Sequence, residues 1–225
     1  MSSICADAFV VAVVVAILAL AGCKELPPNT DRTSPNTATT QKHVLALQAF
    51  IDRESDERIM AICSGIENVE GYRSSLGNTF IPHITLASYL VTPRELRVAE
   101  SQFSKRLTGL NCIQVAMTLQ EEDEDGRLSY FLLPEPTKPL LQFHAQAHSK
   151  LGWSYEPYRQ KDLPGKWQPH LTLFSIPKSQ RPLISDALLK LRKVRVVTIE
   201  RIGLLGFGPT SVSSEVRLEK SESSR

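Results

Sequence analysis

The sequence predicts an α+β fold in which two pseudo-symmetric lobes of mainly antiparallel sheet, with flanking helices, surround a central groove. Three observations lead to this prediction. Strand-like and amphipathic helical segments mix between residues 41 and 220, and a tight hairpin joins two of the strands. A seven-residue motif occurs twice, 87 positions apart, which is typical of an internal duplication. The composition, 42% hydrophobic and 22% charged residues, is that of a globular protein.

The first half of the predicted domain runs from an apolar strand to the helix that follows the first motif. Residues 44–51 (VLALQAFI) form a strand-like run, and residues 54–66 carry apolar side chains at helical spacing. Residues 79–90 are β-like. Thr92 and Pro93 then begin a helix that continues to about Leu107, because threonine caps a helix and proline is favoured in its first turn.

A hairpin opens the second half. Residues 113–120 and 128–133 are strands, and the Asp125-Gly126 pair between them is a strong turn signal. The acidic run at 121–125 is interpreted as the tip of this hairpin rather than as a cation site. The patterning then predicts a helix over 139–151, a strand over 168–176 and a second helix over 181–191. Two closing strands follow, over 194–199 and 211–218, with a turn around Gly206 and Gly208 between them.

The amino terminus has the pattern of an export signal. Residues 8–21 are 14 apolar residues without a charge. A membrane-spanning helix needs about 20 such residues, so the run matches the apolar core of a secretory signal better. It ends in Leu20-Ala21-Gly22-Cys23, which resembles the bacterial lipobox. We therefore expect removal of residues 1–22 and lipidation of Cys23; a cleaved signal without lipid and an uncleaved anchor are the alternatives.

This signal sets the expected domain organisation and location. Residues 23–40 are rich in Pro, Thr and Asn and form a lipid-anchored tether, 41–220 are the folded domain, and 221–225 are a tail. The protein is expected at the bacterial cell envelope, on the periplasmic side or the cell surface, attached to the membrane through its N-terminal lipid. We expect the domain to be a monomer.

The repeated motif contains the residues with catalytic potential. Residues 82–88 read PHITLAS and residues 169–175 read PHLTLFS, with five of seven positions identical. Because residues i and i+2 of a strand share a face, His83 projects with Thr85 and His170 with Thr172. The residues between them point into each lobe's own core: Ile84, Leu86, Leu171 and Leu173.

If the two lobes pack around a pseudo-twofold axis, two imidazoles and two hydroxyls face one cleft. This set suits phosphodiester cleavage. An imidazole titrates near neutral pH, so one ring can act as a base while the other acts as an acid. The hydroxyls can donate hydrogen bonds to the non-bridging oxygens as charge builds at phosphorus. Neither role requires a metal or another cofactor.

The paired His-x-Thr motifs resemble those of the two-histidine (2H) phosphoesterase superfamily, which includes 2′-5′ RNA ligase-like proteins and 2′,3′-cyclic nucleotide phosphodiesterases. The resemblance covers roughly residues 43–219. It implies a bilobal α+β fold with His83 and His170 as catalytic residues and Thr85 and Thr172 as phosphate ligands. It also implies that His170 activates water and His83 protonates the leaving ribose oxygen. The implied partner is a nucleotide or a short RNA, with a 2′,3′-cyclic phosphate as the substrate.

Two alternatives to this function stay open. In the first, the protein is an enzyme that cleaves 2′-5′ linked oligonucleotides. In the second, the domain binds nucleotides without catalysis. Zinc would need three or four ligands, and no Cys or carboxylate stands at ligand spacing beside either motif, so we expect no metal. The net charge of only +2 argues against a protein that coats nucleic acid by charge alone.

Several residues outside the motifs have a functional and a structural interpretation. The loop before the second motif carries Arg159, Lys161, Lys166 and Trp167; we take Lys166 and Trp167 as candidate substrate contacts, the alternative being a solvated loop anchored by the tryptophan. His144 and His148 share one helix face and are predicted to be an exposed or interfacial pair. Cys63 and Cys112 would form a disulfide or, more commonly, stay free.

Overall fold

The chain folds into helices packed against a largely antiparallel sheet. The structure is a computed structural model that describes residues 42–74, 81–207 and 211–220. Within these ranges the strands are β1 (His43–Ile51), β2 (Arg73–Ser74), β3 (His83–Val91), β4 (Ile113–Glu124), β5 (Arg127–Pro134), β6 (Glu156–Pro157), β7 (Leu171–Pro177), β8 (Val196–Phe207) and β9 (Ser211–Arg217). The α-helices are α1 (Arg53–Ser64), α2 (Pro93–Leu107), α3 (Lys138–Leu151) and α4 (Ser185–Leu191), and two 3₁₀ helices span Gln160–Asp162 and Lys178–Ile184.

The order of the strands is pseudo-symmetric about the centre of the sheet. It reads β2-β7-β5-β4-β8-β1-β3-β6, with β9 beside β8. The strand that carries the first motif, β3, pairs with β1, and the strand that carries the second, β7, pairs with β5 in the same antiparallel manner. At the centre, β4 and β8 pair through their first residues, Ile113–Ala116 with 196–199. We call β8, β1, β3 and β6 the first lobe, and β4, β5, β7 and β2 the second lobe.

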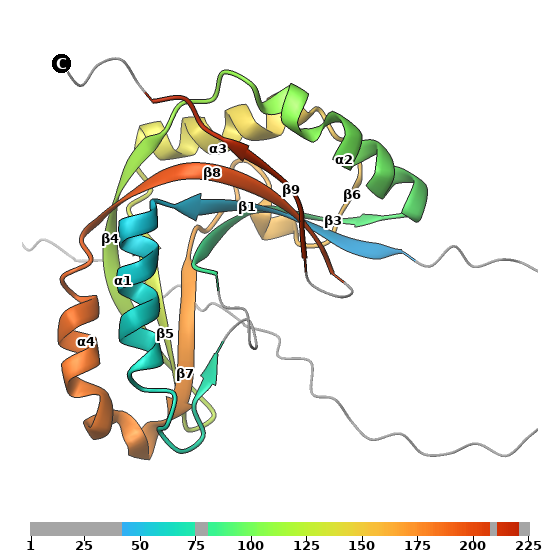
Figure 1. Ribbon diagram of the computed structural model, residues 1–225. Helices are drawn as coiled ribbons and strands as arrows, with labels where there is room; N and C mark the ends of the chain where they lie inside the picture. Colours follow the sequence, from blue (N-terminus) through green and yellow to red (C-terminus); the bar gives the residue numbers. More distant parts are fainter. Residues whose placement is uncertain (1–41, 75–80, 208–210, 221–225) are drawn as a thin grey trace, which may run out of the picture. The chain divides into compact units, whose positions relative to one another are not determined.

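The two lobes exchange elements across the pseudo-twofold axis. The short strand β2 comes just before the first motif in the chain but pairs with β7 of the second. Similarly, β6 comes before the second motif and pairs with β3 of the first. The helices follow the same rule, because α1 packs with α4 and α2 packs with α3 (Figure 1). Each lobe therefore contains parts of both halves of the sequence.

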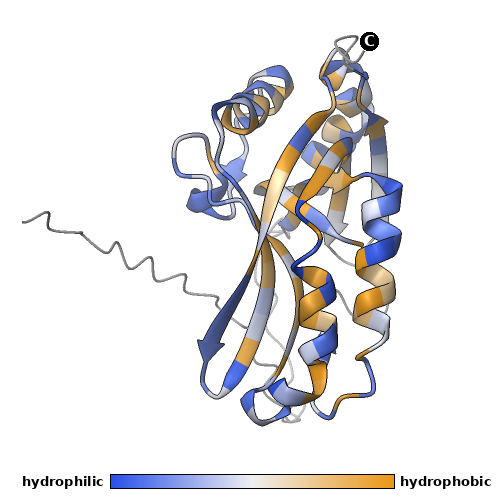
Figure 2. Ribbon diagram, turned by 90° about the vertical axis from the view of Figure 1, so that its left-hand side faces the viewer, coloured by the Kyte–Doolittle hydropathy of each residue, from blue (hydrophilic) through white to orange (hydrophobic). Residues whose placement is uncertain are grey.

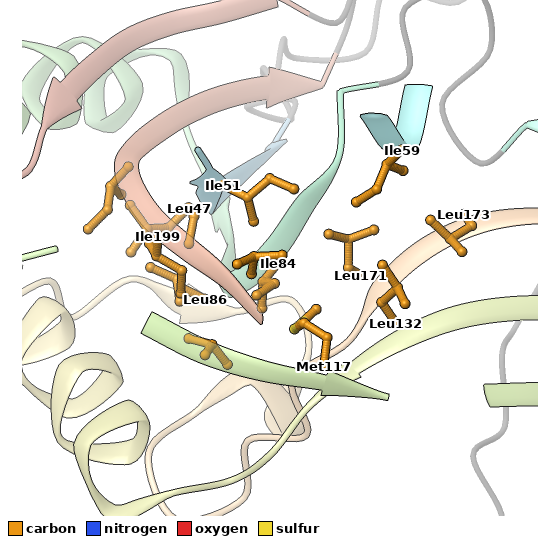
Figure 3. Close-up of a cluster of buried hydrophobic side chains, with 14 of the residues drawn as sticks. Leu47, Ile51, Ile59, Ile84, Leu86, Met117, Leu132, Leu171, Leu173 and Ile199 are labelled. Atoms are coloured by element: carbon orange, nitrogen blue, oxygen red, sulfur yellow. The ribbon is translucent and has the colours of Figure 1, made fainter. Parts of the chain in front are cut away.

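The apolar faces of the sheet and helices form one continuous core. Helix α2 shows how the sequence specifies this: Thr92 and Glu95 form a capping box, and Ala99, Phe103 and Leu107 recur every fourth residue on its buried side. Figure 2 shows the resulting mixture of hydrophobic and hydrophilic positions along the helices. Residues of both lobes meet in a single cluster (Figure 3), so the expectation that each lobe has a core of its own is wrong.

The predicted fold class is confirmed, and most elements lie where the sequence places them. The hairpin turns at Asp125 and Gly126, whose φ angles are 49° and 77°, as the favoured two-residue turn requires. The helix predicted over 181–191 differs, because only Ser185–Leu191 is α-helical and a 3₁₀ helix precedes it. Pro182 lies in that 3₁₀ segment, and proline disfavours α-helix at itself and at the preceding residue.

Several sequence predictions lie outside the described residues. These are the signal at 1–22, the lipidation site Cys23, the tether at 23–40, the turn around Gly208 and the tail at 221–225. They stay predictions. Gly206, expected in the same turn, lies within β8 instead. In the part of the chain that the structure describes, no helix has the length and hydrophobicity needed to cross a bilayer.

Candidate active site

The two motif histidines occupy corresponding positions in the two lobes. His83 is the first residue of β3, and His170 directly precedes β7. The apolar residues of both motifs are fully buried and hold the strands against the core: Ile84, Leu86, Leu171 and Leu173 (Figure 3). The histidines and threonines between them are half-buried and face the opposite side of the sheet.

Each motif strand carries a bulge at the same place. Thr85 pairs with Gln48, whereas Ala87 pairs with Leu47, so β3 has one extra residue after the motif threonine. The register of β7 against β5 shifts in the same way between Thr172 and Phe174. A bulge of this kind changes which later residue faces which side. It brings Ser88, rather than Ala87, to the face that carries His83 and Thr85.

The two motifs meet at one pocket, a cavity of about 360 Å³. Strands β3 and β7 are not hydrogen-bonded neighbours, yet they lie in contact. The pocket is lined by Val44, Ala46, Gln48, His83, Thr85, Ser88, Tyr158, Arg159, His170 and Thr172. The four predicted site residues, His83, Thr85, His170 and Thr172, are therefore together; their catalytic roles stay a prediction.

Both histidines are held by the same local contact. The Nδ1 atom of His83 lies 2.9 Å from the carbonyl oxygen of Ile81, and Nδ1 of His170 lies 3.1 Å from that of Gln168. A carbonyl oxygen only accepts, so each Nδ1 carries the proton and donates it. In the neutral ring this leaves the Nε2 lone pair available, which is the arrangement a general base requires.

The environment lowers the pKa of both histidines. Burial is the main cause for each, because it disfavours the charged ring. The carbonyl contacts oppose this effect. The charge of His170 lowers the pKa of His83 further, while the cations Lys161 and Arg159 lower that of His170 and Asp162 raises it. The surroundings of His170 thus contain charges that the surroundings of His83 lack.

The two motif threonines both line the pocket and have hydroxyls available for hydrogen bonding. Neither the Thr85 nor the Thr172 hydroxyl makes a hydrogen bond within the residues that the structure describes. Each hydroxyl lies on the pocket wall, one on each motif strand. A hydroxyl can donate one hydrogen bond to an oxygen of a bound phosphate. The arrangement therefore offers one donor from each lobe, next to one imidazole from each lobe.

The loop before the second motif lines the pocket, but not with Lys166 and Trp167, the two candidate substrate contacts from the sequence. Arg159 and its neighbour Tyr158 line the pocket. Lys166 is exposed and is not among the lining residues. Trp167 is only 8% exposed, and its indole Nε1 donates to the Thr85 carbonyl oxygen at 2.9 Å. Trp167 thus anchors the loop, as in the alternative interpretation, and does not form part of the pocket wall.

A buried polar network fixes this loop to β3 and α3. The Trp167 ring stacks on His144 at 4.0 Å, and His144 Nε2 donates to the Leu86 carbonyl oxygen at 2.8 Å. The Ser88 hydroxyl donates to the Asp162 carboxylate at 2.5 Å. The expectation that His144 is exposed or interfacial is wrong, because it is 2% exposed. Its helix face packs against β3 and the loop, a contact that helical spacing alone does not reveal.

The remaining candidate sites from sequence have structural roles. The acidic run covers the end of β4 and the first residue of the hairpin turn, and in it Asp123 pairs with Lys178 and Glu121 with Arg181. Cys63 and Cys112 are free. Across residues 42–74, 81–207 and 211–220, no group of three or more His, Cys, Asp or Glu side chains is arranged to hold a metal.

Sequence reasoning missed several pocket residues. Gln48 is the only polar residue in the apolar run 44–51, a signal that could have marked it. Ser88 has a counterpart, Ser175, in the second motif, and this repetition was a second available signal. Tyr158 had none, because its place depends on the pairing of the two-residue strand β6 with β3.

Comparisons with known proteins indicate the fold but no family. No family model and no curated protein matches the chain. Among solved structures, TT0787 of Thermus thermophilus is similar with a TM-score of 0.50 and 13% identity, over 80% of this chain and 100% of that chain. At this level of identity the similarity shows a shared α+β fold.

Two further solved structures are similar to a lower degree. LigT of E. coli, in its apo form, has a TM-score of 0.49 and 14% identity over 79% of this chain and 98% of that one. Usb1 of Kluyveromyces marxianus has a TM-score of 0.42 and 12% identity, over 79% of this chain and 98% of that chain.

Proposed function

We propose that the protein is a metal-independent phosphodiesterase that opens 2′,3′-cyclic phosphates of nucleotides or RNA ends by two-histidine acid–base catalysis. One observation supports this most: two His–Thr pairs, from motifs 87 residues apart, line a single pocket. Each histidine has its Nδ1 proton engaged by a carbonyl, which leaves its Nε2 for chemistry. The pocket thus contains two groups for proton transfer and two hydroxyl donors for a phosphate.

The proposed reaction adds water across one P–O bond. His170 Nε2 removes a proton from water as its oxygen forms a bond to phosphorus. The bond from phosphorus to one ribose oxygen breaks, and His83 donates a proton to that oxygen. Thr85 and Thr172 donate hydrogen bonds to the non-bridging oxygens, on which charge builds. The product is a phosphate monoester with a free hydroxyl beside it, and the two histidines have exchanged protonation states.

The charges around the pocket support this division of roles. Besides burial, the cations Lys161 and Arg159 lower the pKa of His170 and favour its neutral form, whereas the Gln168 carbonyl and Asp162 act in the opposite direction. A neutral imidazole is the form that accepts a proton from water. Arg159 also lies on the pocket wall, where its positive charge would attract an anionic substrate.

The test is product analysis with the full chain. The chain is incubated with the four 2′,3′-cyclic mononucleotides in the presence of a chelator, and the products are separated by chromatography. We expect nucleoside monophosphates. Replacing His83→Ala or His170→Ala should reduce the rate by about 10²–10⁴-fold, the usual contribution of one general acid or base. His43→Ala is the matched control, because His43 lies in β1 but outside the pocket lining.

Other outcomes distinguish the alternatives. Thermal stabilisation by nucleotides without any product would indicate a non-catalytic binding module. Turnover of 2′-5′ linked oligonucleotides but not of cyclic phosphates would indicate the second enzymatic alternative. Activity that disappears with the chelator would contradict metal independence, and near-normal activity of the His83→Ala/His170→Ala double variant would contradict the mechanism.

A further inference from the structure

Gln48 is a buried polar residue whose side chain has no hydrogen-bond partner among the residues that the structure describes. It lies in β1, is 2% exposed and lines the pocket. Its amide makes no hydrogen bond within the described residues. Among those residues, the buried side-chain atoms that lack both a partner and solvent contact are Asp56 Oδ1 and Trp153 Nε1. The Gln48 amide is not one of them, so it opens toward the pocket.

Neither of the strands beside β1 supplies a hydrogen-bond partner for the Gln48 amide. On β3 its cross-strand partner is Thr85, whose hydroxyl belongs to the proposed phosphate site. On β8 its partner is Gly203, which has no side chain. Gly203 cannot easily be replaced, because a Cβ atom there would lie 2.4 Å from the ring of Phe50. A buried amide is normally hydrogen-bonded, so the missing partner of Gln48 has to come from the pocket.

The second lobe lacks this feature at the equivalent position. Gln48 pairs with Thr85, and its counterpart Phe131 pairs with Thr172. The Phe131 ring lies edge-on to His170, with the ring centroids 6.0 Å apart. The pocket lining includes three residues of β1 and none of β5. The phosphate site is therefore symmetric, whereas the space beyond it extends only along the first lobe.

We propose that Gln48 hydrogen-bonds the nucleoside part of the substrate, which lies along β1 between Gln48 and Val44. This inference rests on the proposed function. The two residues are four apart, so about 13 Å of strand is available at about 3.3 Å per residue. The cavity of about 360 Å³ is in the range of small-ligand sites. Val44 and Ala46 form an apolar wall in the part of the pocket that lies along β1, and Tyr158 adds an aromatic side chain.

The chemistry of the amide favours the nucleoside over the phosphate. An amide presents both a donor and an acceptor, and so do the hydroxyls and ring edges of a nucleoside. A phosphate diester presents acceptors only, and the two threonine hydroxyls and Arg159 already supply donors beside it. The Gln48 carbonyl oxygen would repel the phosphate oxygens.

Two substrates that share the reacting ring test the proposal. A 2′,3′-cyclic nucleotide and glycerol 1,2-cyclic phosphate both contain the five-membered cyclic phosphate, but only the first has a nucleoside. Gln48→Leu keeps the approximate size and removes the hydrogen bonds. We expect kcat/KM for the cyclic nucleotides to fall about tenfold, the effect of one lost hydrogen bond, and that for the glycerol compound to stay within about twofold.

A matched control is available in the other lobe. Ser129 of β5 pairs with Ser175, as Ala46 of β1 pairs with Ser88, and it lies outside the pocket lining. Ser129→Ala removes a hydrogen-bonding group beside the second motif and should leave both substrates unaffected. Gln48→Met serves as a second variant if Gln48→Leu has a lowered melting temperature.

The remaining outcomes would overturn the inference without affecting the proposed function. Equal losses with both substrates would assign Gln48 to the phosphate, a loss with Ser129→Ala would place the nucleoside along β5, and no loss would mean no contact. If the wild-type chain opens neither substrate, the proposed function fails. In that case the inference about Gln48 is tested by binding. Compared with the wild-type chain, Gln48→Leu should bind a nucleoside 3′-monophosphate about tenfold more weakly and inorganic phosphate equally well. Unchanged binding of both would overturn the inference.

Discussion

At the scale of single residues, each motif histidine is oriented by a carbonyl two positions earlier in the chain. The contact is the same in both lobes, Ile81 with His83 and Gln168 with His170. Because the carbonyl is part of the backbone, the tautomer does not depend on a distant side chain. In the neutral ring each Nε2 therefore keeps its lone pair, as the proposed acid–base roles require.

The lowered histidine pKa values predict an acidic optimum. The proposed reaction needs one neutral and one protonated imidazole, and burial lowers the pKa of both below the ordinary 6.5. As pH rises through these values the acid loses its proton, so kcat/KM should fall. We expect the maximum of kcat/KM for a cyclic nucleotide below pH 6.5, measured from about pH 5 to pH 8. A maximum above pH 7 would contradict the assigned acid.

The two tryptophans predict a contrast in stability. Trp167 Nε1 donates to the Thr85 carbonyl oxygen, whereas Trp153 Nε1 is buried without a partner within the described residues. Trp167→Phe should lower the free energy of unfolding by about 1–2 kcal/mol more than Trp153→Phe, because only the first change removes a hydrogen bond. Urea denaturation of both variants measures the difference. Equal losses would show that the Trp167 hydrogen bond adds no stability.

At the scale of elements, the central question is how a strand presents a histidine, a threonine and a serine on one face. Strict alternation would bring Ala87 to the face of Thr85. The bulge in β3 brings Ser88 there instead, where Asp162 accepts its hydrogen bond. The same bulge follows Thr172 in β7. The irregularity is thus part of the duplicated unit and sets the width of the polar face in each lobe.

The close approach of β8 to β1 predicts a sensitive glycine. A Cβ atom at Gly203 would lie 2.4 Å from the Phe50 ring, while one at Gly206 of the same strand would meet nothing within 4 Å. Gly203→Ala should destabilise the fold by about 1–3 kcal/mol through overpacking, and Gly206→Ala should have little effect. Chemical denaturation of the two variants gives the comparison. If Gly206→Ala lowers the free energy of unfolding by the same amount, the effect comes from the backbone of β8 and not from the contact with Phe50.

At the scale of the whole molecule, the exchange of elements between lobes makes the pocket a product of the entire domain. Neither half of the sequence can complete a lobe, because β2 and β6 each pair across the pseudo-twofold axis. The network around His144 adds a second connection, joining α3, β3 and the loop that carries Arg159. The pocket therefore depends on segments from both halves of the sequence.

This network predicts a loss of stability in acid. Burial lowers the pKa of His144 from 6.5 to about 4, and the neighbouring charge of His148 contributes. Below pH 6.5 the unfolded chain binds a proton that the folded state does not bind until about pH 4. The free energy of unfolding should therefore fall as pH decreases over this window, by up to about 3 kcal/mol. Denaturation between about pH 4 and pH 7 measures it.

A variant without this titrating group provides the control. His144→Phe keeps a ring to stack on Trp167 and has no proton to bind, so its stability should depend less steeply on pH over the same window. Besides each other and the Trp167 ring, His144 and His148 contact the Leu86 and Asp162 carbonyls and the Tyr89 hydroxyl. An unchanged slope would assign the pH dependence to His148 or to another group.

Most of the helices and strands, and the four motif residues that line the pocket, could be predicted from the sequence alone. Hydrophobic periodicity marked the main strands and helices, Asp125-Gly126 marked the hairpin, and the repeat identified His83, Thr85, His170 and Thr172. These are local signals, which depend on neighbours within a few residues. The same local reasoning was wrong for the exposure of His144 and could not choose between the two interpretations of Trp167, because burial of a side chain depends on elements distant in the chain.

That the two motifs share one pocket, and that this pocket extends along the first lobe, follows from contacts between distant strands. The pairing of β2 with β7 and of β6 with β3 involves strands of two residues, too short to show any periodicity. The unpartnered amide of Gln48 became apparent only when Thr85 and Gly203 were seen on either side of it. Such contacts arise from packing between segments that are distant in the chain, so the local sequence pattern does not predict them.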